Sequence, residues 1–592
     1  MSYFFNEKQS TIMRLLIFIL RLILLNQFEV YLERKNKNKN KNSIRLKLRR
    51  WPQSIPVEML QNGLQYDSSR YYNKDFNISK LGKVCSFFFG KEILYGTILN
   101  RQTEYDLSYM MGHGKVTVPL CLPGKKFQDL KIVVDSRKTK LDIMECSKWQ
   151  YFTFPENCKS VKISSKESKI ILGEPFPHKQ VPQNDSRPKC VVLLVLDSLS
   201  QSVFDKIDKE TLMPNTMQYF NSGRIFTHHY AQGEWSLPNN ASILTGLYTS
   251  NHCLYHPDTV LNFRNEDEVY LSTGLNNKTP LLSEVFSNEG YLTFAGNANW
   301  RVHPLYKYTR GFDRFLYYGN TTSDRELIYD ATQQINAFPK RDHFLYLNLL
   351  KIHSEEYPAW TFSSEVNCDI EDRIIINEDS KLLKKYSRSM VNRYYKLIKE
   401  TDDNLKILYD FLNKTYSRDE IVICLTADHG AVYLDEDEHI LSETHVNIPL
   451  LVRANKIKPG TDNSLVQNID IFPSILNLCG INIHNAEIDG KLWPVLGGNQ
   501  RDYVLAESIY GSEYKLKLRG KDHIYNMDSI IKNNSISFEE ARKLFWEVSK
   551  DSKYDKRKLE KRSKDFVKYD RIAEEHIKSV NNNIHKEHIS AD

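Results

Sequence analysis

Three continuous runs of apolar residues stand out in the middle of the chain. They are Cys190–Leu196, Phe344–Leu350 and Ile421–Leu425. Such runs are typical of strands that are buried on both faces of a parallel sheet. Helical stretches lie between and after them, at 281–288, 382–412 and 471–478. Because strands alternate with helices, we expect an α/β fold over residues 188–525, with a doubly wound sheet and helices on both faces.

The stretch before this region has a different pattern. Its short apolar or alternating runs are separated by turn signals such as Gly124, Pro155 and Gly173. The runs that predict strands are Val116–Val118, Leu130–Val134, Trp149–Phe154, Val161–Ile163 and Ile170–Leu172. No helix of ordinary length fits between them. Residues 81–187 are therefore expected to form a small β-sandwich domain, with either a binding or a purely structural role.

The two ends of the chain have another character again. Residues 1–80 are rich in Lys, Asn and Tyr and are expected to be a leader and linker. Their apolar stretch, Ile12–Leu25, is interrupted by Arg14 and Arg21 and is too short to cross a bilayer comfortably. An interfacial helix that makes peripheral membrane contact and a simple leader both stay open. The charged residues 526–592 predict a helical C-terminal tail.

Composition narrows the functional classes. The chain has 592 residues, 41% of them hydrophobic, and a net charge of +7 that is concentrated near the termini. This favours solvated tails over a nucleic-acid surface, and no zinc-finger spacing or RNA-binding signature is present. The nine cysteines are scattered without a CxxC pair, which argues against a disulfide framework or a zinc cluster. Cysteine usage favours a cytoplasmic or membrane-associated location over secretion.

Metal-ligand residues follow two of the predicted strands. Asp197 and Ser198 come directly after the first strand, and Asp428-His429 come just after the third. In open α/β sheets, ligands bind beyond the carboxyl ends of the strands. Carboxylates with an imidazole suit a divalent cation. A single Asp here would be an ordinary loop cap, but two such strand ends in one sheet predict a metal site.

A third element contains a serine at the start of a predicted helix. Ser236 can act as the N-cap, Pro238 suits the first turn, and the helix should end near Gly246. A helix N-terminus attracts a sulfate or phosphate group. A serine that touches a metal there can lose its proton and become a nucleophile. Taken alone, the motif would be an ordinary N-cap.

This stretch resembles the signature of the sulfatase family, in which a cysteine or serine is followed by x-Pro-Ser-Arg and then by x-x-x-Leu-Thr-Gly. The matching positions are Ser236, Pro238, Leu244, Thr245 and Gly246. The resemblance, within the alkaline phosphatase superfamily, covers about 190–525. Its other parts are Asp197, Gly290–Asp313, His353, Asp402, Asp428–Gly430, Glu443, Ile448–Leu450, Asn468–Leu476 and Asp489-Gly490. It implies the family's fold and one divalent metal held by Asp197, Ser236, Asp428 and His429.

The chain also departs from the family pattern. Asn240 stands where the signature has the arginine that supports formylglycine. The family's Gly-Lys-Trp-His element, whose lysine holds the sulfate, corresponds to a stretch with Asn299 and His303. Ser198 replaces the second acid of the usual Asp-Asp pair. The resemblance implies calcium, whereas a histidine ligand with an unmodified serine suits zinc or manganese.

The resemblance implies attack by Ser236 on the ester, with a histidine that protonates the leaving alcohol. His353 and His445 are the favoured candidates, followed by His439 and His303. The leading hypothesis is a hydrolase or transferase with unmodified Ser236, acting on a sulfate or phosphate ester of a surface polysaccharide or lipid. The alternatives are a true sulfatase with formylglycine made from Ser236 and a non-catalytic relative that binds a glycan or another anion.

Overall fold

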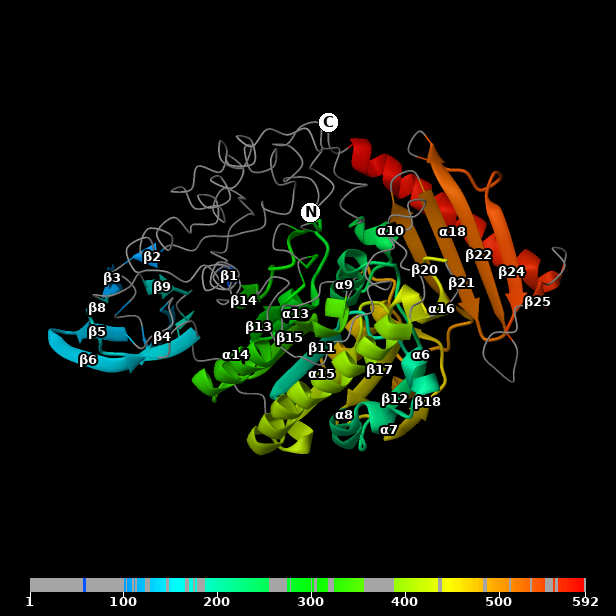
Figure 1. The fold of residues 1–592 in the computed structure, drawn as a ribbon. Coiled ribbons are helices and arrows are strands. Elements are labelled where there is room, and N and C mark those ends of the chain that lie inside the picture. Colours follow the sequence, from blue (N-terminus) through cyan, green and yellow to red (C-terminus); the bar gives the residue numbers. More distant parts are fainter. Residues whose placement is uncertain are drawn as a thin grey trace, which may run out of the picture. The chain divides into compact units, whose positions relative to one another are not determined.

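The chain divides into two compact units, Met1–Lys179 and Gln180–Asp592. Each unit is described by itself (Figure 1). The computed structural model describes residues 57–59, 101–102, 104–108, 111, 114–122, 128–144, 149–165, 170–173, 176–177, 187–254, 274–276, 278–299, 301–302, 306–317, 324–355, 388–434, 439–482, 487–510, 513–532, 535–548, 557–558 and 563–589. The expected leader lies outside these residues, except for strand β1 (Val57–Met59). Within the described residues, no helix is long and apolar enough to cross a membrane.

The first unit contains two small antiparallel sheets. One has β2 (Arg101–Gln102), β4 (Val116–Cys121), β7 (Trp149–Phe154), β9 (Ile170–Leu172) and β10 (Phe176–Pro177). The other has β3 (Glu104–Asp106), β5 (Gln128–Val134), β6 (Arg137–Met144) and β8 (Val161–Ser164). Val118 and Leu120 of the first sheet and Ile132 and Ile163 of the second belong to one buried cluster. The predicted strands are confirmed, and β6 is an addition because its lysines obscured the apolar alternation.

The second unit is built on a large central sheet. Its strands run in the order β14 (Arg314–Tyr317), β13 (Leu292–Asn297), β15 (His343–Leu349), β11 (Cys190–Leu196), β16 (Ile421–Thr426), β17 (Asn447–Arg453), β12 (Arg224–Tyr230) and β18 (Gly460–Asp462), with β19 (Val466–Gln467) also paired to β12. Strand β17 is antiparallel to both neighbours, so the sheet is mixed. The three apolar runs of the sequence became β11, β15 and β16, which pair in parallel as expected, and only the direction of β17 was not expected. Full burial gives the same apolar run in either direction, so the buried sequence of β17 does not reveal which way it runs.

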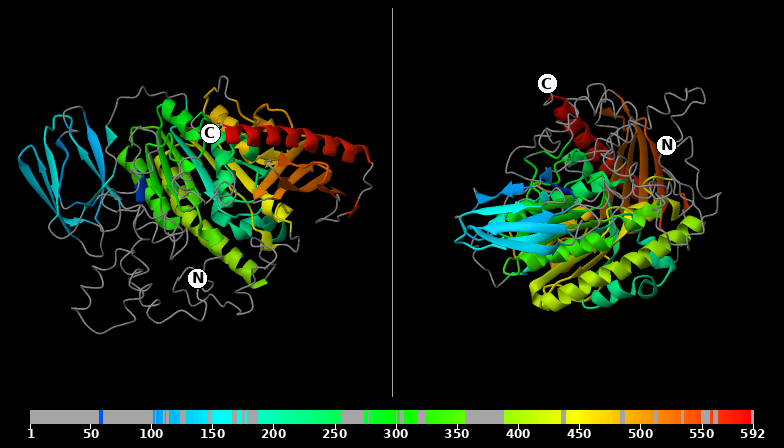
Figure 2. Two further views of the ribbon diagram at one scale, coloured as in Figure 1. Left: turned by 90° about the horizontal axis from the view of Figure 1, so that it is seen from above. Right: turned by 60° about the vertical axis from the view of Figure 1, so that its left-hand side comes forward.

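Helices cover both faces of this sheet, as predicted. Phe286 of α13 (Leu282–Asn288) stacks on Phe344 of β15. Leu327 of α14 (Asp324–Ala337) packs where a side chain on Gly296 would point, because a Cβ built there would lie 3.0 Å from it. Gly296 pairs with Leu347 of β15, so Leu327 lies on the same face of the sheet as Leu347. Because side chains alternate along a strand, Phe344 and Leu347 point to opposite faces. The sheet is therefore sandwiched between helices, and Figure 2 shows the layers from two further sides.

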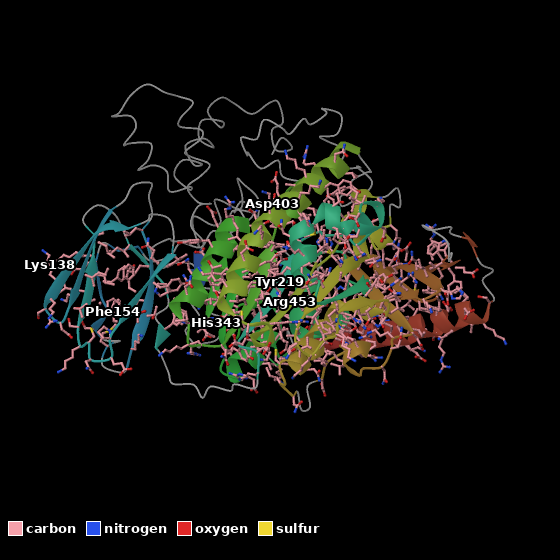
Figure 3. The ribbon with its side chains drawn as sticks, turned by 90° about the horizontal axis from the view of Figure 1, so that it is seen from below. Lys138, Phe154, Tyr219, His343, Asp403 and Arg453 are labelled. Carbon is pink, nitrogen blue, oxygen red and sulfur yellow. The ribbon has the colours of Figure 1, made fainter. Side chains whose placement is uncertain are left out.

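The other helices are mostly short. They are α6 (Ser202–Lys206), α7 (Lys209–Leu212), α8 (Pro214–Tyr219), α9 (Ser236–Thr245), α10 (Thr249–His252), α16 (Glu443–Val446) and α17 (Ile471–Leu478), beside the long α15 (Arg388–Thr415) and α18 (Lys564–Ile589). Asp402 of α15 accepts hydrogen bonds from the backbone N–H groups of Asn215 (2.9 Å) and Thr216 (2.8 Å). These are free donors at the start of α8, so Asp402 acts as a cap between helices. Nearby, Arg453 stacks on Tyr219 (Figure 3).

The expectation of a helical tail over 526–592 is wrong for its first part. Strands β20 (Tyr503–Tyr510), β21 (Glu513–Gly520), β22 (His523–Lys532), β24 (Arg542–Glu547) and β25 (Arg557–Lys558) form an antiparallel sheet, and β23 (Ser535–Ile536) pairs with β22. Helix α18 lies along this sheet (Figure 1). It buries Tyr569, Ala573, Ile577 and Val580 in the sheet's core. This narrow stripe at helical spacing was hidden among charged residues that face solvent.

Candidate metal centre

The ends of two parallel strands bring together three residues that could hold a metal ion. Asp197 follows β11, and Asp428 and His429 follow β16, whose Thr426 pairs with Val195 of β11. The side chains of all three are buried. Each offers one ligand atom, and these atoms all lie within 4.8 Å of one another. The predicted residues Asp197, Asp428 and His429 thus share one centre at the carboxyl edge of the sheet.

Ser198 links the two carboxylates. Its hydroxyl donates to Asp197 Oδ1 (2.8 Å), and its backbone N–H donates to Asp428 Oδ1 (3.3 Å). The residue has a φ of +66°, which a non-glycine residue adopts only at a cost. The hydroxyl of Tyr394 donates to its carbonyl (2.6 Å) and helps to hold this conformation. Ser198 therefore orients the carboxylates from the position where the family has a second acid.

The imidazole of His429 is held in one tautomer. Its Nδ1 lies 2.8 Å from the carbonyl oxygen of Gly430, to which it donates. A neutral ring then carries its lone pair on Nε2. That nitrogen lies 3.8 Å from Asp197 Oδ1 and 3.9 Å from Asp428 Oδ2. The ring is therefore prepared to bind a cation between the two carboxylates.

Ser236 lies at this centre, although it is not the helix cap. The N-cap of α9 is Trp235 in an extended conformation, and Ser236 is the first helical residue. This corrects the expectation of an N-cap serine: Pro238 continues the first turn, and the serine side chain turns away from the backbone. Its hydroxyl donates to Asp197 Oδ2 (3.1 Å) and lies 3.2 Å from His429 Nε2. The serine oxygen thus contacts two residues of the predicted metal set.

Asn240 sits one turn further along α9, in the signature's arginine position. Its Nδ2 donates to the Ser236 carbonyl (2.7 Å) and to Asp428 Oδ2 (3.2 Å). Its Oδ1 accepts from the Tyr346 hydroxyl and from Asn348 Nδ2 (2.9 Å). Asn240 is fully buried. It therefore connects helix α9, strand β15 and Asp428 through short polar contacts.

The loop after β13 adds two further contacts. Asn299 Nδ2 donates to Asp197 Oδ2, and its Oδ1 accepts the backbone N–H of Arg301 (2.8 Å). The Arg301 guanidinium stacks over the Trp235 ring, 4.6 Å from the ring centre. Sequence analysis missed Arg301, because nothing in its local pattern indicates this stacking. The candidate His303 lies outside the described residues.

The remaining histidine candidates differ in their surroundings. The half-buried His353, on the 3₁₀ helix η4 (Lys351–Glu355), has its ring centre 6.2 Å from that of His429. The His445 ring is 5.1 Å from His429, is buried, and donates from Nδ1 to the Ile440 carbonyl (2.6 Å). Burial, and then the neighbouring His429, lower the pKa of His445 to about 3. His439 instead contacts Asp528 of β22 (3.1 Å).

The charges of the centre fit a divalent cation. Burial, and then the charge of Asp428, raise the pKa of Asp197 to about 6. Two buried carboxylates side by side repel each other unless a cation or a proton neutralises them. Two carboxylate oxygens, one imidazole nitrogen and a serine oxygen are ligands that divalent metals use. The residues that are present therefore fit a metal site of the kind found in sulfatases.

Comparison with known proteins agrees with this geometry. The sulfatase family model matches residues 189–481, about half of the chain. N-acetylglucosamine-6-sulfatase of Homo sapiens is 36% identical over 103 residues, which is 16% of this chain and 19% of that protein. N-acetylglucosamine-6-O-sulfatase of Bacteroides thetaiotaomicron is 28% identical over 148 residues, or 24% of this chain and 26% of that protein. The chain thus spans about a fifth to a quarter of the length of these relatives.

A solved structure extends the likeness of the fold. A Bacteroides fragilis protein assigned to the sulfatases superposes with a TM-score of 0.52 and 15% sequence identity, over 69% of this chain and 98% of that one. This level of identity supports the fold alone. The family match over residues 189–481, with which the buried Asp, Asp and His group agrees, shows that the chain belongs to the sulfatase family, within the alkaline phosphatase superfamily.

Proposed function

We propose that this protein is a metal-dependent hydrolase or transferase that cleaves a sulfate or phosphate ester, with the unmodified Ser236 oxygen as nucleophile. One observation carries the proposal. The Ser236 hydroxyl lies 3.1 Å from Asp197 Oδ2 and 3.2 Å from His429 Nε2. A nucleophilic oxygen that shares its neighbours with a metal-ligand set is the arrangement needed for attack on an anionic ester.

Asp197, Asp428 and His429 would hold the divalent ion, which supplies Lewis-acid stabilisation of negative charge when bound. The chain's own residues do the rest. Asp197 Oδ2 accepts the Ser236 hydroxyl proton in its hydrogen bond and so orients the oxygen. Ser236 then passes its hydroxyl proton to Asp197 Oδ2 and forms a bond to sulfur or phosphorus while the bond to the leaving alcohol breaks. Water or an acceptor hydroxyl releases the resulting serine ester, which restores the serine.

His353 is the proposed proton donor to the leaving alkoxide. It is only half-buried, so a large alcohol can approach its ring. Its ring also approaches that of His429. His445 is a poorer donor, because its pKa of about 3 leaves it neutral at ordinary pH. We assign His445 a structural role, in which its ring packs against the ring of His429.

The surroundings of Asn240 favour an unmodified serine. The signature's arginine, which supports formylglycine in the family, is replaced by a shorter side chain. That side chain is saturated by Ser236, Asp428, Tyr346 and Asn348. Because the Asn240 amide already has partners for both its nitrogen and its oxygen, this position holds together without a cation. These contacts support serine chemistry, and formylglycine is the second candidate, favoured by the sulfatase names of the relatives.

The proposed substrate is an anionic ester on a glycan or lipid. The names of the two relatives specify a sulfate on N-acetylglucosamine, which suggests a sugar as the leaving alcohol. Arg301 supports the anionic character of the substrate, because its stacking on Trp235 fixes a positive charge beside the residue that precedes Ser236. The choice between sulfate and phosphate is an outcome of the assay.

A comparison of paired esters tests this proposal. Purified protein would be loaded with calcium, zinc or manganese and assayed on p-nitrophenyl sulfate, p-nitrophenyl phosphate and sulfated or phosphorylated sugars. We expect turnover that a chelator abolishes and that Ser236→Ala lowers by at least a thousandfold. Equal turnover by Ser236→Ala would refute the nucleophile, and a protein that binds these glycans without turning them over would support the non-catalytic alternative.

A further inference from the structure

A buried ion pair holds helix α16, the helix that also carries His445. Lys517 of β21 is 3% exposed, and its ammonium is 2.6 Å from Glu443 Oε1 of helix α16. The same ammonium donates to the carbonyl oxygen of Leu441 (2.9 Å). On the other carboxylate oxygen, Tyr230 donates from 3.3 Å and Arg519 lies 3.7 Å away. The C-terminal sheet is thus bound to α16 through charged side chains that are buried from water.

A buried ion pair adds little net stability to a fold, because desolvation offsets the attraction between its charges. Removing an ammonium and a carboxylate from water has a large desolvation cost, and well-packed apolar residues often stabilise a fold equally well. The neighbours of Lys517 on its strand, Leu516 and Leu518, are ordinary core residues. The pair therefore indicates a role in fixing the position of the segment that it contacts, which contains Leu441 and Glu443.

The gripped segment leads directly to the metal centre. The carbonyl of His445 accepts the backbone N–H of Gly430 (2.7 Å), next to His429. The carbonyl of Thr444 accepts the N–H of Ala431 (3.2 Å), and a Cβ on Gly430 would lie 2.1 Å from the Thr444 oxygen. This close approach fixes the backbone after His429 against α16.

The same segment also reaches the loop before the nucleophile. The carbonyl of Val446 accepts the backbone N–H of Ala231 (2.8 Å). At the other end of the segment, His439 contacts Asp528 of β22 (3.1 Å). Residues 439–446 therefore form a bridge that is held by the C-terminal sheet at one side and touches both the His429 loop and the Ser236 loop at the other.

We infer that Lys517 is a positioning residue, which acts through Glu443 and the Leu441 carbonyl to set α16, and thereby places His445 and the His429 loop relative to Ser236. This inference rests on the proposed function of that centre. It gives the C-terminal sheet a part in the reaction although none of its described residues contacts Ser236, Asp197, Asp428 or His429. Loss of the ammonium should loosen the bridge and misplace His429 while the substrate surface stays intact.

Lys517→Met tests the inference, with Arg187→Met as the matched control. Arg187 forms a similarly buried ion pair with Asp342 (2.8 Å) near the start of β11, at the opposite end of that strand from Asp197. We expect Lys517→Met to lower kcat at least tenfold with KM changed less than twofold. Native-state hydrogen exchange of peptides covering 428–446 should become faster. Arg187→Met should lose a similar amount of stability but keep kcat and the exchange of those peptides.

Two further variants keep the test decisive. Lys517→Arg retains the charge and should recover part of kcat. If Lys517→Met does not fold, the double variant Lys517→Met with Glu443→Gln removes the unpaired carboxylate, and it should still lose kcat because Leu441 loses its donor. Wild-type kcat and exchange in the folded variant would overturn the inference and leave the proposed function standing. If the wild type turns over no ester, the proposed function fails. The positioning role is then decided by two measurements on Lys517→Met: hydrogen exchange at 428–446 should be faster and the calorimetric affinity for zinc lower than in the wild type.

Discussion

At the scale of single residues, the centre combines side chains that pattern could indicate with others that it could not. Asp197, Asp428 and His429 could be predicted to meet, because parallel strands end at one edge of a sheet. The roles of Asn240 and Arg301 could not, because each depends on partners from distant parts of the chain, such as Tyr346 and Trp235. His439 has the same residue type as His353, yet its partner is Asp528.

Asn240→Ala should lower stability. The substitution leaves Asp428 Oδ2, the Tyr346 hydroxyl and Asn348 with lost partners in a buried site. A buried polar group without its partner costs roughly 1–3 kcal/mol, so we expect a loss in that range or somewhat above it. Urea unfolding would measure it. The exposed Asn413→Ala, which loses a surface contact with Arg453, is the control and should change stability by less than about 0.5 kcal/mol.

Arg301→Met should weaken the binding of an anionic ester. The variant keeps an apolar contact with Trp235 but removes the charge. We expect KM to rise about tenfold, equivalent to roughly 1.4 kcal/mol, with a smaller change in kcat. Steady-state kinetics would show this. Arg453→Met removes a comparable stacking contact, over Tyr219 at 4.3 Å, and should leave KM unchanged. An unchanged KM in Arg301→Met would exclude a role in anion binding.

At the scale of elements, fully buried strands and apolar helices could be predicted from the sequence. The direction in which each strand runs could not. The run Cys190–Leu196 became β11, and the stretch 471–478 became α17. The apolar sequence of β17 does not reveal that it runs antiparallel to β16. Strands β22 and β24 were missed because they carry charged residues on their solvent side, which suggests a helix or a tail when the partner strands are unknown.

Glu507 of β20 predicts how the C-terminal sheet responds to acid. Its buried carboxylate accepts from His576 of α18 (2.9 Å), Tyr514 (2.9 Å) and the Ser250 backbone (2.7 Å). Burial alone would raise the pKa of Glu507, but His576 and Ser250 outweigh it, so the net pKa lies below the ordinary value. A lowered folded-state pKa adds stability above the unfolded value, near 4.5, and this stability is lost as pH falls.

The corresponding test compares the wild type with Glu507→Gln. The free energy of unfolding should differ most at neutral pH, and the gap should close as pH falls below the unfolded value. Chemical denaturation across this range would measure it. A gap that is constant with pH would show that the charge of Glu507 contributes nothing.

At the scale of the whole molecule, family membership was predictable and the extent of the second unit was not. Family motifs end before the C-terminal sheet, yet this sheet belongs to the same compact unit as the metal centre. Contacts such as Ser508 Oγ to Glu234 Oε1 (2.8 Å) tie it to the loop before Ser236. Long-range contacts of this kind leave no local signal. The role expected for the N-terminal sheets stays a prediction.

Metal binding should stabilise the second unit as a whole. A ligand that binds only the folded state at a hundred times its Kd adds about 2.7 kcal/mol. We therefore expect a chelator to lower the Tm and a divalent cation to restore it. Differential scanning calorimetry would follow both. Asp428→Asn should abolish the metal-dependent rise, and an equal rise in that variant would place the metal elsewhere.

The most direct test of the central claim is mass spectrometry of the peptide that contains Ser236, taken from resting enzyme and from enzyme quenched during turnover. The account predicts an unmodified serine at rest and, during turnover, a mass gain that matches a sulfate or phosphate on this residue. A resting peptide that has lost two hydrogens would mean formylglycine and would contradict the account despite Asn240.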